Sequence, residues 1–324
     1  MLKRKLLLLG MVIAMLFTCT SCKMKNPKLA VTTYPIQYLA ERIGGNNVTV
    51  ANISEDIVIQ SAQVKGNFED ILEESSALFY IAELEPYFDV YSDAIRGDEL
   101  TLVNLASKSI FYEFQRYTTT SVDEKTAVVE GPYYDGEIFK NVDVYKQDPM
   151  IWMDPVSMIS AAEIVRDYLI ENYPEYRTEF LENYRSLEMD LTRLDMEYQE
   201  LKQMLYDVEF VCMTPSFGPW QKSYGVAIYP ICLSKYGATP SVEQLNVIKQ
   251  KIIDDGIRYI VKEPNLNEEM NTLYASLKDE LNLIEVEVSN VSSLSATQKA
   301  ENKDYLTIMY ENLSQLEKIG KGEI

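Results

Sequence analysis

The stretch from Pro174 to Tyr206 constrains the fold of this chain more than any other. Its apolar residues recur at alternating steps of three and four, at Tyr176, Phe180, Tyr184, Leu187, Leu191, Leu194, Tyr198, Leu201 and Leu205. This spacing places a single apolar stripe along an α-helix. Pro174 suits the first helical position, where no amide donor is needed, and no Gly or Pro follows it within the run. At 1.5 Å per residue the helix would be roughly 45–50 Å long, which exceeds the diameter of a small domain.

The segments on both sides of this helix alternate short apolar runs with helical patterns. Leu29–Thr33 and Leu78–Ile81 are strand-like runs before it, and Val208–Met213 and Arg258–Glu263 are strand-like runs after it. Such alternation indicates parallel sheets covered by helices. We therefore predict an α/β fold of two lobes, each a mostly parallel sheet with flanking helices, joined by one long backbone helix. The expected boundaries are 28–173 for the N-terminal lobe, 174–206 for the linking helix and 207–324 for the C-terminal lobe.

Residues 107–147 interrupt the α/β pattern of the first lobe. They are rich in Tyr, Thr, Asp and Glu and keep no period, and Gly131-Pro132 and Asp135-Gly136 are turn signals. We predict a long excursion that contains a hairpin of Thr126–Glu130 and Glu137–Val142. A loop of this length inside a compact domain is often functional.

The first 27 residues have the pattern of an export signal. Lys3, Arg4 and Lys5 precede the apolar run Leu6–Phe17, which is short for a membrane span, and the small residue Ser21 precedes Cys22. This pattern resembles a bacterial lipoprotein signal, so we predict a signal peptide at 1–21, lipidation of Cys22 and a tether at 22–27. A plain secretory signal is the alternative. The mature protein would then be extracytoplasmic and lipid-anchored to the bacterial cell membrane.

Composition excludes several function classes. The formal net charge is −20, which argues against binding to nucleic acid or to anionic lipid surfaces. The chain contains no histidine, so no Ser/His/Asp or Cys/His catalytic arrangement is possible, and we predict that it is not an enzyme. Cys212 and Cys232 lie in neighbouring strand-like runs, where they either pair or remain as buried thiols.

Several motifs, taken in order, resemble one known family. They are Val31-Thr32-Thr33-Tyr34-Pro35-Ile36, Ile43-Gly44-Gly45, Asp148-Pro149-Met150-Ile151-Trp152-Met153-Asp154-Pro155, Phe217-Gly218, Tyr224-Gly225, Pro240-Ser241, Val261-Lys262-Glu263-Pro264 and Asp304-Tyr305-Leu306 through Asn312-Leu313. Together they resemble the extracytoplasmic solute-binding lipoproteins of zinc and manganese ABC importers. This resemblance implies a ligand held between the lobes, an ABC permease in the membrane as partner, and a monomer.

The ligand positions implied by this resemblance carry unusual residues. They fall on Ala62, Met150, Thr214 and Ser289, where the family usually presents histidines and acids. Zinc and manganese prefer imidazole, thiolate or carboxylate, so we expect no metal cofactor, a degenerate metal site and an unknown small ligand. The alternative function is a surface adhesive or accessory protein that kept the fold and lost transport.

Other residues near these motifs have structural and functional interpretations. We expect Asp148 and Asp154 to hold turns or cap a helix, Glu263 to make structural hydrogen bonds, and Trp152 and Trp220 to pack in the core. A soft Cu(I) site at Met150, Met213 and Cys212 is the competing interpretation of the sulfur atoms.

Overall fold

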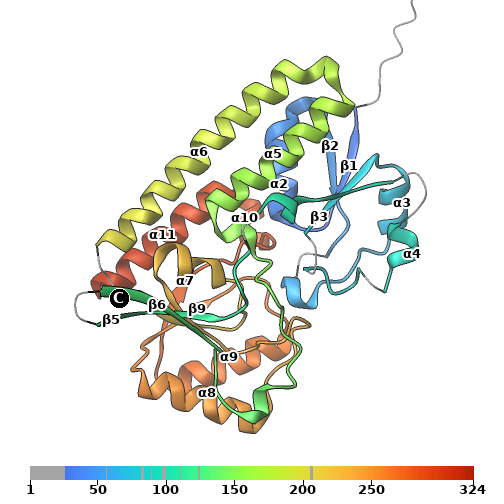
Figure 1. The fold of residues 1–324 in the computed structure, drawn as a ribbon. Helices are drawn as coiled ribbons and strands as arrows, with labels where there is room; N and C mark the ends of the chain where they lie inside the picture. Colours follow the sequence, from blue (N-terminus) through green and yellow to red (C-terminus); the bar gives the residue numbers. More distant parts are fainter. Residues whose placement is uncertain are drawn as a thin grey trace, which may run out of the picture.

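The computed structural model describes residues 26–324 except 56, 82–83, 89, 97–99, 110, 123–124 and 205–206, and the side chains of 119–126 are not described. The predicted signal peptide, the lipidation site Cys22 and most of the tether lie outside the described residues. Figure 1 shows two lobes stacked end to end, with one long helix running beside both. This arrangement confirms the predicted fold of two parallel-sheet lobes with a long helix between them.

The N-terminal lobe is built on a four-stranded parallel sheet. Its strands are β1 (Lys28–Val31), β2 (Thr49–Asn52), β3 (Ala77–Tyr80) and β4 (Thr101–Asn104), in the order β2-β1-β3-β4. The central strands β1 and β3 are almost wholly buried because helices cover both faces. The helices of this lobe are α2 (Tyr34–Gly44), α3 (Phe68–Glu73), α4 (Ser92–Ile95) and α5 (Pro155–Asn172), with 3₁₀ turns at η1 (Gly45–Asn47), η2 (Ile59–Ser61), η3 (Leu105–Lys108) and η5 (Ile151–Met153).

The C-terminal lobe repeats this plan. Its parallel strands are β7 (Glu209–Cys212), β8 (Ala227–Pro230), β9 (Tyr259–Lys262) and β10 (Ile284–Glu287), in the order β10-β9-β7-β8. Its helices are α7 (Gly218–Tyr224), α8 (Val242–Asp254), α9 (Glu268–Glu280), α10 (Ala296–Ala300) and α11 (Tyr305–Lys321). Ser241 begins α8 with a capping box, in which its hydroxyl accepts from the Gln244 N–H and the Gln244 side chain accepts from the Ser241 N–H.

The linking helix α6 extends from Arg177 to Gln203 and is preceded by a separate 3₁₀ turn, η6 (Pro174–Tyr176). The predicted stripe is its buried face, formed by Phe180, Tyr184, Leu187, Leu191, Leu194, Tyr198 and Leu201. One end of this face packs on α2 and α5 and the other on α7 and α11, so a single stripe serves both lobes. The buried Tyr198 hydroxyl also donates to the carbonyl of Met309 on α11 at 2.8 Å.

The predicted hairpin in the excursion is misplaced. The structure pairs β5 (Arg116–Val122) with β6 (Lys125–Gly131) as an antiparallel ribbon, and residues 137–139 form a 3₁₀ turn, η4 (Glu137–Phe139). Pro132 has no amide donor, so it ends the second strand instead of separating two strands. The prediction took this turn signal as the middle of the hairpin.

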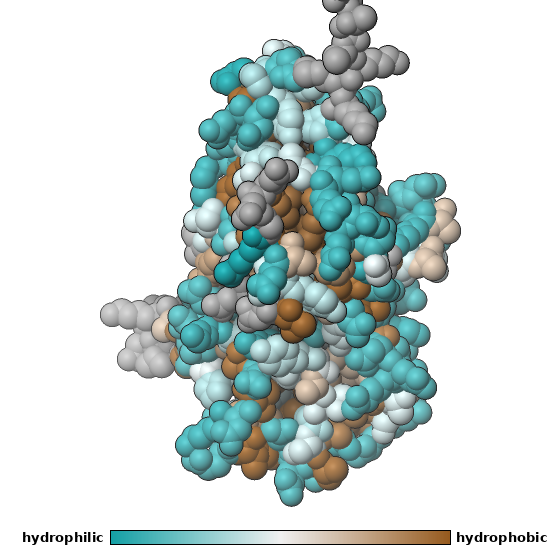
Figure 2. Space-filling model, turned by 90° about the vertical axis from the view of Figure 1, so that its right-hand side faces the viewer, coloured by the Kyte–Doolittle hydropathy of each residue, from teal (hydrophilic) through white to brown (hydrophobic). Residues whose placement is uncertain are grey.

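On the face that Figure 2 shows, hydrophilic residues cover most of the surface and hydrophobic ones lie in small separate patches. Among the described residues, no helix combines the length and the apolar character that crossing a membrane requires.

Candidate functional site

Each sheet has one point where the order of its strands reverses. The chain passes from β1 outward to β2 on one side and from β3 outward to β4 on the other, which leaves a switch point between β1 and β3. In the C-terminal lobe the corresponding point lies between β7 and β9. Ligands of open parallel sheets bind outside the carboxyl ends of the strands at such points. The two switch points are therefore the first places to look for a site.

Direct hydrogen bonds join the loops that follow these strand ends. The Thr33 hydroxyl, after β1, donates to the carbonyl of Ser292 at 2.9 Å, and the Val58 N–H donates to the carbonyl of Asn265 at 3.1 Å. The indole N–H of Trp152 donates to the carbonyl of Asn290 at 2.8 Å. The carboxyl edges of the two sheets thus meet in one interlobe contact.

Glu263 occupies the switch point of the C-terminal lobe. Its Oε1 accepts from the backbone N–H groups of Met213 and Thr214 at 2.8 and 2.9 Å. Its Oε2 accepts from the Thr214 hydroxyl at 2.5 Å and from Asn290 Nδ2 at 2.9 Å. Burial raises the pKa of Glu263, while these four hydrogen bonds act to lower it. The expected structural role is correct, because the carboxylate ties the ends of β7 and β9 to the loop after β10.

Glu85 occupies the equivalent place in the N-terminal lobe. Its Oε1 accepts from the hydroxyl of Thr32, after β1, and from the N–H of Ile81, after β3. Burial raises the pKa of Glu85 to about 7. A buried glutamate bonded to a threonine hydroxyl therefore closes both switch points.

Asp148 is the third buried acid of this region. It accepts from the N–H of Met150 at 3.0 Å, which is the turn role that the sequence predicts, and burial raises its pKa to about 7. A Cβ atom on Gly218 would lie 1.7 Å from Asp148 Oδ2. Only glycine therefore allows the start of α7 to lie this close to the carboxyl group. Asp154 caps α5 by accepting from the N–H of Val156 at 3.3 Å, as expected.

The four predicted ligand positions are all buried but differ in their surroundings. Ala62 follows η2 in the N-terminal lobe, and Met150 precedes η5. Thr214 belongs to the Glu263 cluster. The N–H and carbonyl of Ser289 are both bonded to Asn312 of α11 at 2.8 Å, so this residue is tied to α11.

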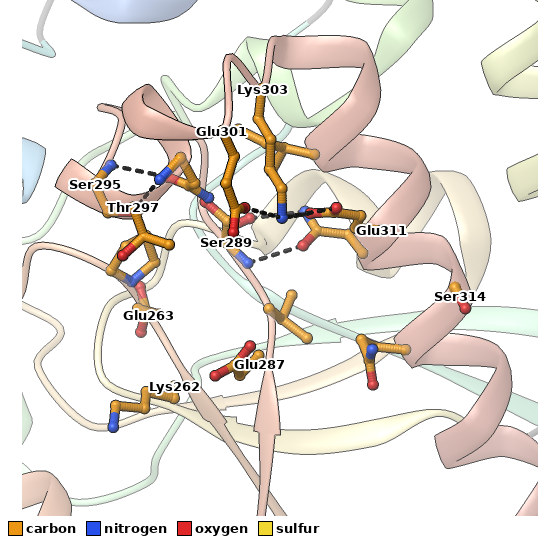
Figure 3. A pocket seen from close by; sticks show the side chains of 16 residues that line it. Lys262, Glu263, Glu287, Ser289, Ser295, Thr297, Glu301, Lys303, Glu311 and Ser314 are labelled. Atoms are coloured by element: carbon orange, nitrogen blue, oxygen red, sulfur yellow. Dashed lines mark hydrogen bonds and ion pairs between the residues drawn. The ribbon is translucent and has the colours of Figure 1, made fainter.

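Ser289 also borders a polar pocket of about 580 Å³ at the carboxyl ends of β9 and β10 (Figure 3). There Lys303 lies between Glu301 and Glu311, with Nζ to carboxylate distances of 3.0 and 2.8 Å. The ammonium group of Lys303 is thus already paired with two carboxylates. Glu263 also lines this pocket, which therefore borders the switch point of the C-terminal lobe.

Two residues of the contact were missed by the sequence analysis. Gln60, on η2, donates from Nε2 to the Ser216 hydroxyl at 3.3 Å, and that hydroxyl lies 2.7 Å from the Thr214 hydroxyl. We call Gln60, Thr214, Ser216, Glu263 and Asn290 the interlobe site. Its side chains carry two amides, two hydroxyls and one carboxylate. These groups can form hydrogen bonds with a solute or offer it oxygen ligands. In the described part of the chain, no three His, Cys, Asp or Glu residues lie together as metal ligands.

The sulfur residues do not form a pair. Cys212 and Cys232 are buried free thiols, and burial raises the pKa of both. Trp152 and Trp220 are fully buried, as predicted, and the Trp220 indole donates to the Met153 carbonyl at 2.8 Å.

Comparison with known proteins gives consistent results. The model of the family "Zinc-uptake complex component A periplasmic", ZnuA, matches residues 29–319. The zinc-binding lipoprotein AdcA of Streptococcus pneumoniae serotype 4 is 29% identical over 173 residues, which are 52% of this chain and 33% of AdcA. The zinc-binding protein AdcA of Streptococcus pyogenes serotype M1 is 27% identical over 169 residues, 52% of this chain and 32% of that protein. The match thus spans about a third of the length of these curated relatives.

Solved structures share the fold. The Zn(II)-bound ZnuA-like domain of S. pneumoniae AdcA superposes with a TM-score of 0.68 at 18% identity, covering 91% of this chain and 99% of that domain. The laminin binding protein Lmb of Streptococcus agalactiae, described as bifunctional with adhesin and metal transporting activity, gives a TM-score of 0.70 at 16% identity, covering 90% and 99%.

Proposed function

This chain belongs to the family of the periplasmic zinc-uptake complex component A, and we propose that it is the solute-binding component of an ABC importer, holding its solute at the interlobe site and delivering it to a permease. The observation that carries this proposal is the meeting of two switch points in one contact, linked by Gln60 and Ser216 across the lobes. The family is a solute-binding class, which supports the prediction that this chain is not an enzyme.

The expectation of no bound metal is wrong. The family is that of a zinc-uptake component, and a relative of known structure is Zn(II)-bound, so zinc is the indicated ligand. The expectation failed because it counted donors at only four positions. The family match covers residues 29–319 and therefore outweighs a judgement made from four side chains.

The proposed zinc site is degenerate in its ligand chemistry. Without histidine, the chain lacks the imidazole ligands usual in this family, and the interlobe site offers oxygen atoms instead. Thr214 is the one original candidate that belongs to this site, while Ala62, Met150 and Ser289 remain candidates for its surroundings. Zinc binds oxygen less strongly than it binds a full set of nitrogen or sulfur ligands, so we expect a weaker site than one built on imidazole.

Export and anchoring complete the proposal. A signal peptide at 1–21 and a lipid on Cys22 would hold the protein outside the membrane beside its permease, as a monomer with lobes at 28–173 and 207–324. The description of S. pneumoniae AdcA as a lipoprotein supports this arrangement. The adhesive alternative remains a prediction from the sequence.

Calorimetric titration of the metal-free mature protein with zinc tests the function. We expect one zinc ion per chain, and weaker binding in Thr214→Val, which keeps the side-chain shape and removes the hydroxyl. Thr192→Val, on the exposed side of α6, is the matched control and should bind zinc like the wild type. Absence of both binding heat and a zinc-induced rise in melting temperature would contradict the proposal.

A further inference from the structure

The ribbon of β5 and β6, which lies along the C-terminal lobe, has one open edge (Figure 1). The Tyr117 N–H donates to Gln221 Oε1 at 3.5 Å, and Gln221 Nε2 donates to the Gln115 carbonyl at 3.2 Å, so α7 covers the outer edge of β5. In the described part of the chain, no group bonds to the backbone of β6 on its far side. Apart from isolated contacts, β5 is the one described helix or strand that β6 touches.

The pairing register shows which backbone groups this edge presents. In an antiparallel pair, residues that exchange hydrogen bonds alternate with residues whose N–H and C=O point away from the partner strand. Tyr117 points its N–H away from β6 to reach Gln221, and Tyr117 lies opposite Glu130. Glu130 and Val128, two residues earlier, therefore direct their N–H and C=O outward. An extended peptide can pair with such an edge and add a strand to the sheet.

Neither face of β6 is covered beside these groups. Val128 is 56% exposed, and Val129, on the opposite face, is 48% exposed. Native proteins usually protect an open edge with charges, a proline, a bulge or a covering helix. Glu130 is charged, but its carboxylate is paired with Lys222 Nζ at 3.2 Å, and the segment 127–129 contains neither a charge nor a proline. This edge is therefore suited to pairing and is not protected against it.

A groove of about 610 Å³ lies between one face of the ribbon and α8. Thr118 and Val129 line it from the ribbon, and Val247 and Gln250 line it from α8. Side chains alternate between the two faces of a strand, so a chain paired with β6 would place every second side chain on the face that borders this groove. Val129 and Val247 are both partly exposed and offer those side chains apolar contacts.

Charge indicates which kind of segment fits. Arg116 and Lys251 line the groove, but each is already paired with Asp255, at 3.3 and 3.0 Å. Asp135 and Asp254 also line it, and neither forms an ion pair with a Lys or Arg among the described residues. The whole chain has a formal net charge of −20, so pairing with a second copy would bring two acidic surfaces together. A basic segment is favoured by both facts.

We propose that the outer edge of β6 is a docking site for an extended segment of a partner protein that carries β-branched and basic side chains. The segment adds a third strand to the ribbon through the backbone groups of Val128 and Glu130. Its apolar side chains contact Val129, and its basic side chains are attracted to Asp135 and Asp254. This partner is additional to the solute, and the inference does not depend on zinc binding.

Binding of a fluorescently labelled peptide to the mature protein tests the proposal. The probe is the peptide Val-Val-Lys-Lys-Val-Val-Lys-Lys, and fluorescence anisotropy measures its affinity. One control peptide carries Glu in place of each Lys, which reverses the charge. A second is N-methylated at every residue and therefore has no backbone N–H to donate. Amide hydrogen exchange at Val128 and Glu130 reports the strand pairing itself.

Two variants of the protein test the edge and the groove separately. Val128→Pro removes an outward N–H and leaves the ribbon's own hydrogen bonds, because proline is tolerated where the N–H of an edge strand faces solvent. Val129→Lys replaces an apolar residue of the groove with a cation. Val156→Lys is the matched control, since Val156 lies in the N-terminal lobe and is 50% exposed. Melting temperatures verify that each variant is folded.

We expect saturable binding of the Lys peptide to the wild type and to Val156→Lys. Its affinity should fall at least about tenfold in Val128→Pro and in Val129→Lys, as expected for the loss of a hydrogen bond and its adjoining contacts. The Glu peptide and the N-methylated peptide should also bind the wild type at least about tenfold more weakly. Exchange at Val128 and Glu130 should slow in the complex.

The opposing results are distinct. Equal affinity for the Lys and Glu peptides, equal affinity for the N-methylated peptide, or no saturable binding up to about 1 mM peptide each overturns the proposal. A wild-type dimer in sedimentation that Val128→Pro dissociates also overturns it, because a second copy then occupies the edge. If Val128→Pro is unfolded, Val129→Lys and the control peptides decide, and unchanged affinity in Val129→Lys counts against the docking site. None of these results affects the proposed zinc transport.

Discussion

Replacing Gly218 with alanine should destabilise the protein far more than a single methyl group usually does. The new Cβ would lie 1.7 Å from Asp148 Oδ2 and 3.0 Å from its Cγ, so the buried carboxyl has to move. Moving it strains or breaks the hydrogen bond from the Met150 N–H, and such a hydrogen bond contributes about 0.5–1.5 kcal/mol. Overpacking a filled interior costs about 1–3 kcal/mol. Because the two effects overlap, we expect a loss of about 2–4 kcal/mol in the free energy of unfolding.

Urea denaturation followed by circular dichroism measures this loss. Gly66→Ala is the matched control, since no atom lies within 4 Å of a Cβ there, and it should change the free energy by less than about 0.5 kcal/mol. In an Asp148→Ala background the space is free, so Gly218→Ala should cost at least about 1 kcal/mol less than in the wild type. Equal losses in the two backgrounds would refute the reasoning, because they would show that Asp148 is not what the methyl group meets.

Three further predictions follow from burial, from the linking helix and from the signal. Burial raises the pKa of Asp148 from 3.8 to about 7, so the folded chain binds the carboxyl proton more tightly than the unfolded chain does. The stabilisation by this proton is complete below pH 3.8 and is lost as the pH rises to about 7. Asp148→Asn should reduce this pH-dependent loss in the free energy of unfolding when unfolding is measured across that range. Since α6 has no Pro or Gly at which to kink, X-ray scattering with and without zinc should reveal only a small rotation of the lobes, and a large domain closure would contradict this. Mass spectrometry of the mature N-terminus should find acyl mass on Cys22, and an unmodified N-terminus elsewhere would count against lipidation.

The sequence predicted the elements whose signal is periodic or fully apolar. The stripe from Phe180 to Leu201 is repeated often enough to identify α6, and each central strand is short and almost wholly buried. The hairpin was misplaced because the Thr-rich strand β5 carries no apolar period. The Gly131-Pro132 turn signal can also either end a strand or separate two strands.

The site was less predictable because its members are single residues in loops. Thr214 and Glu263 were found through motifs that follow strands, but Gln60 has no pattern around it, and its importance depends on a contact with a residue 156 positions away. Gln60 stands out only because buried polar atoms normally have hydrogen-bond partners. This requirement can be tested only when the positions of the two lobes are known.

The excursion between β4 and α5 has a consequence for the order in which the chain folds. Its β5 strand packs on α7 and β8, and Arg116 donates to the Tyr229 hydroxyl at 2.6 Å and pairs with Asp255 at 3.3 Å. These partners are synthesised about a hundred residues later than the hairpin, whereas α5, which follows the hairpin, returns to the first lobe. Domains generally fold from the N-terminus during synthesis. The first lobe can therefore assemble around β1 to β4 and α5 before α7 and β8, on which the hairpin packs, have been synthesised. The ribbon therefore remains in water until α7 and β8 emerge, and the Thr-rich composition of β5 suits such exposure.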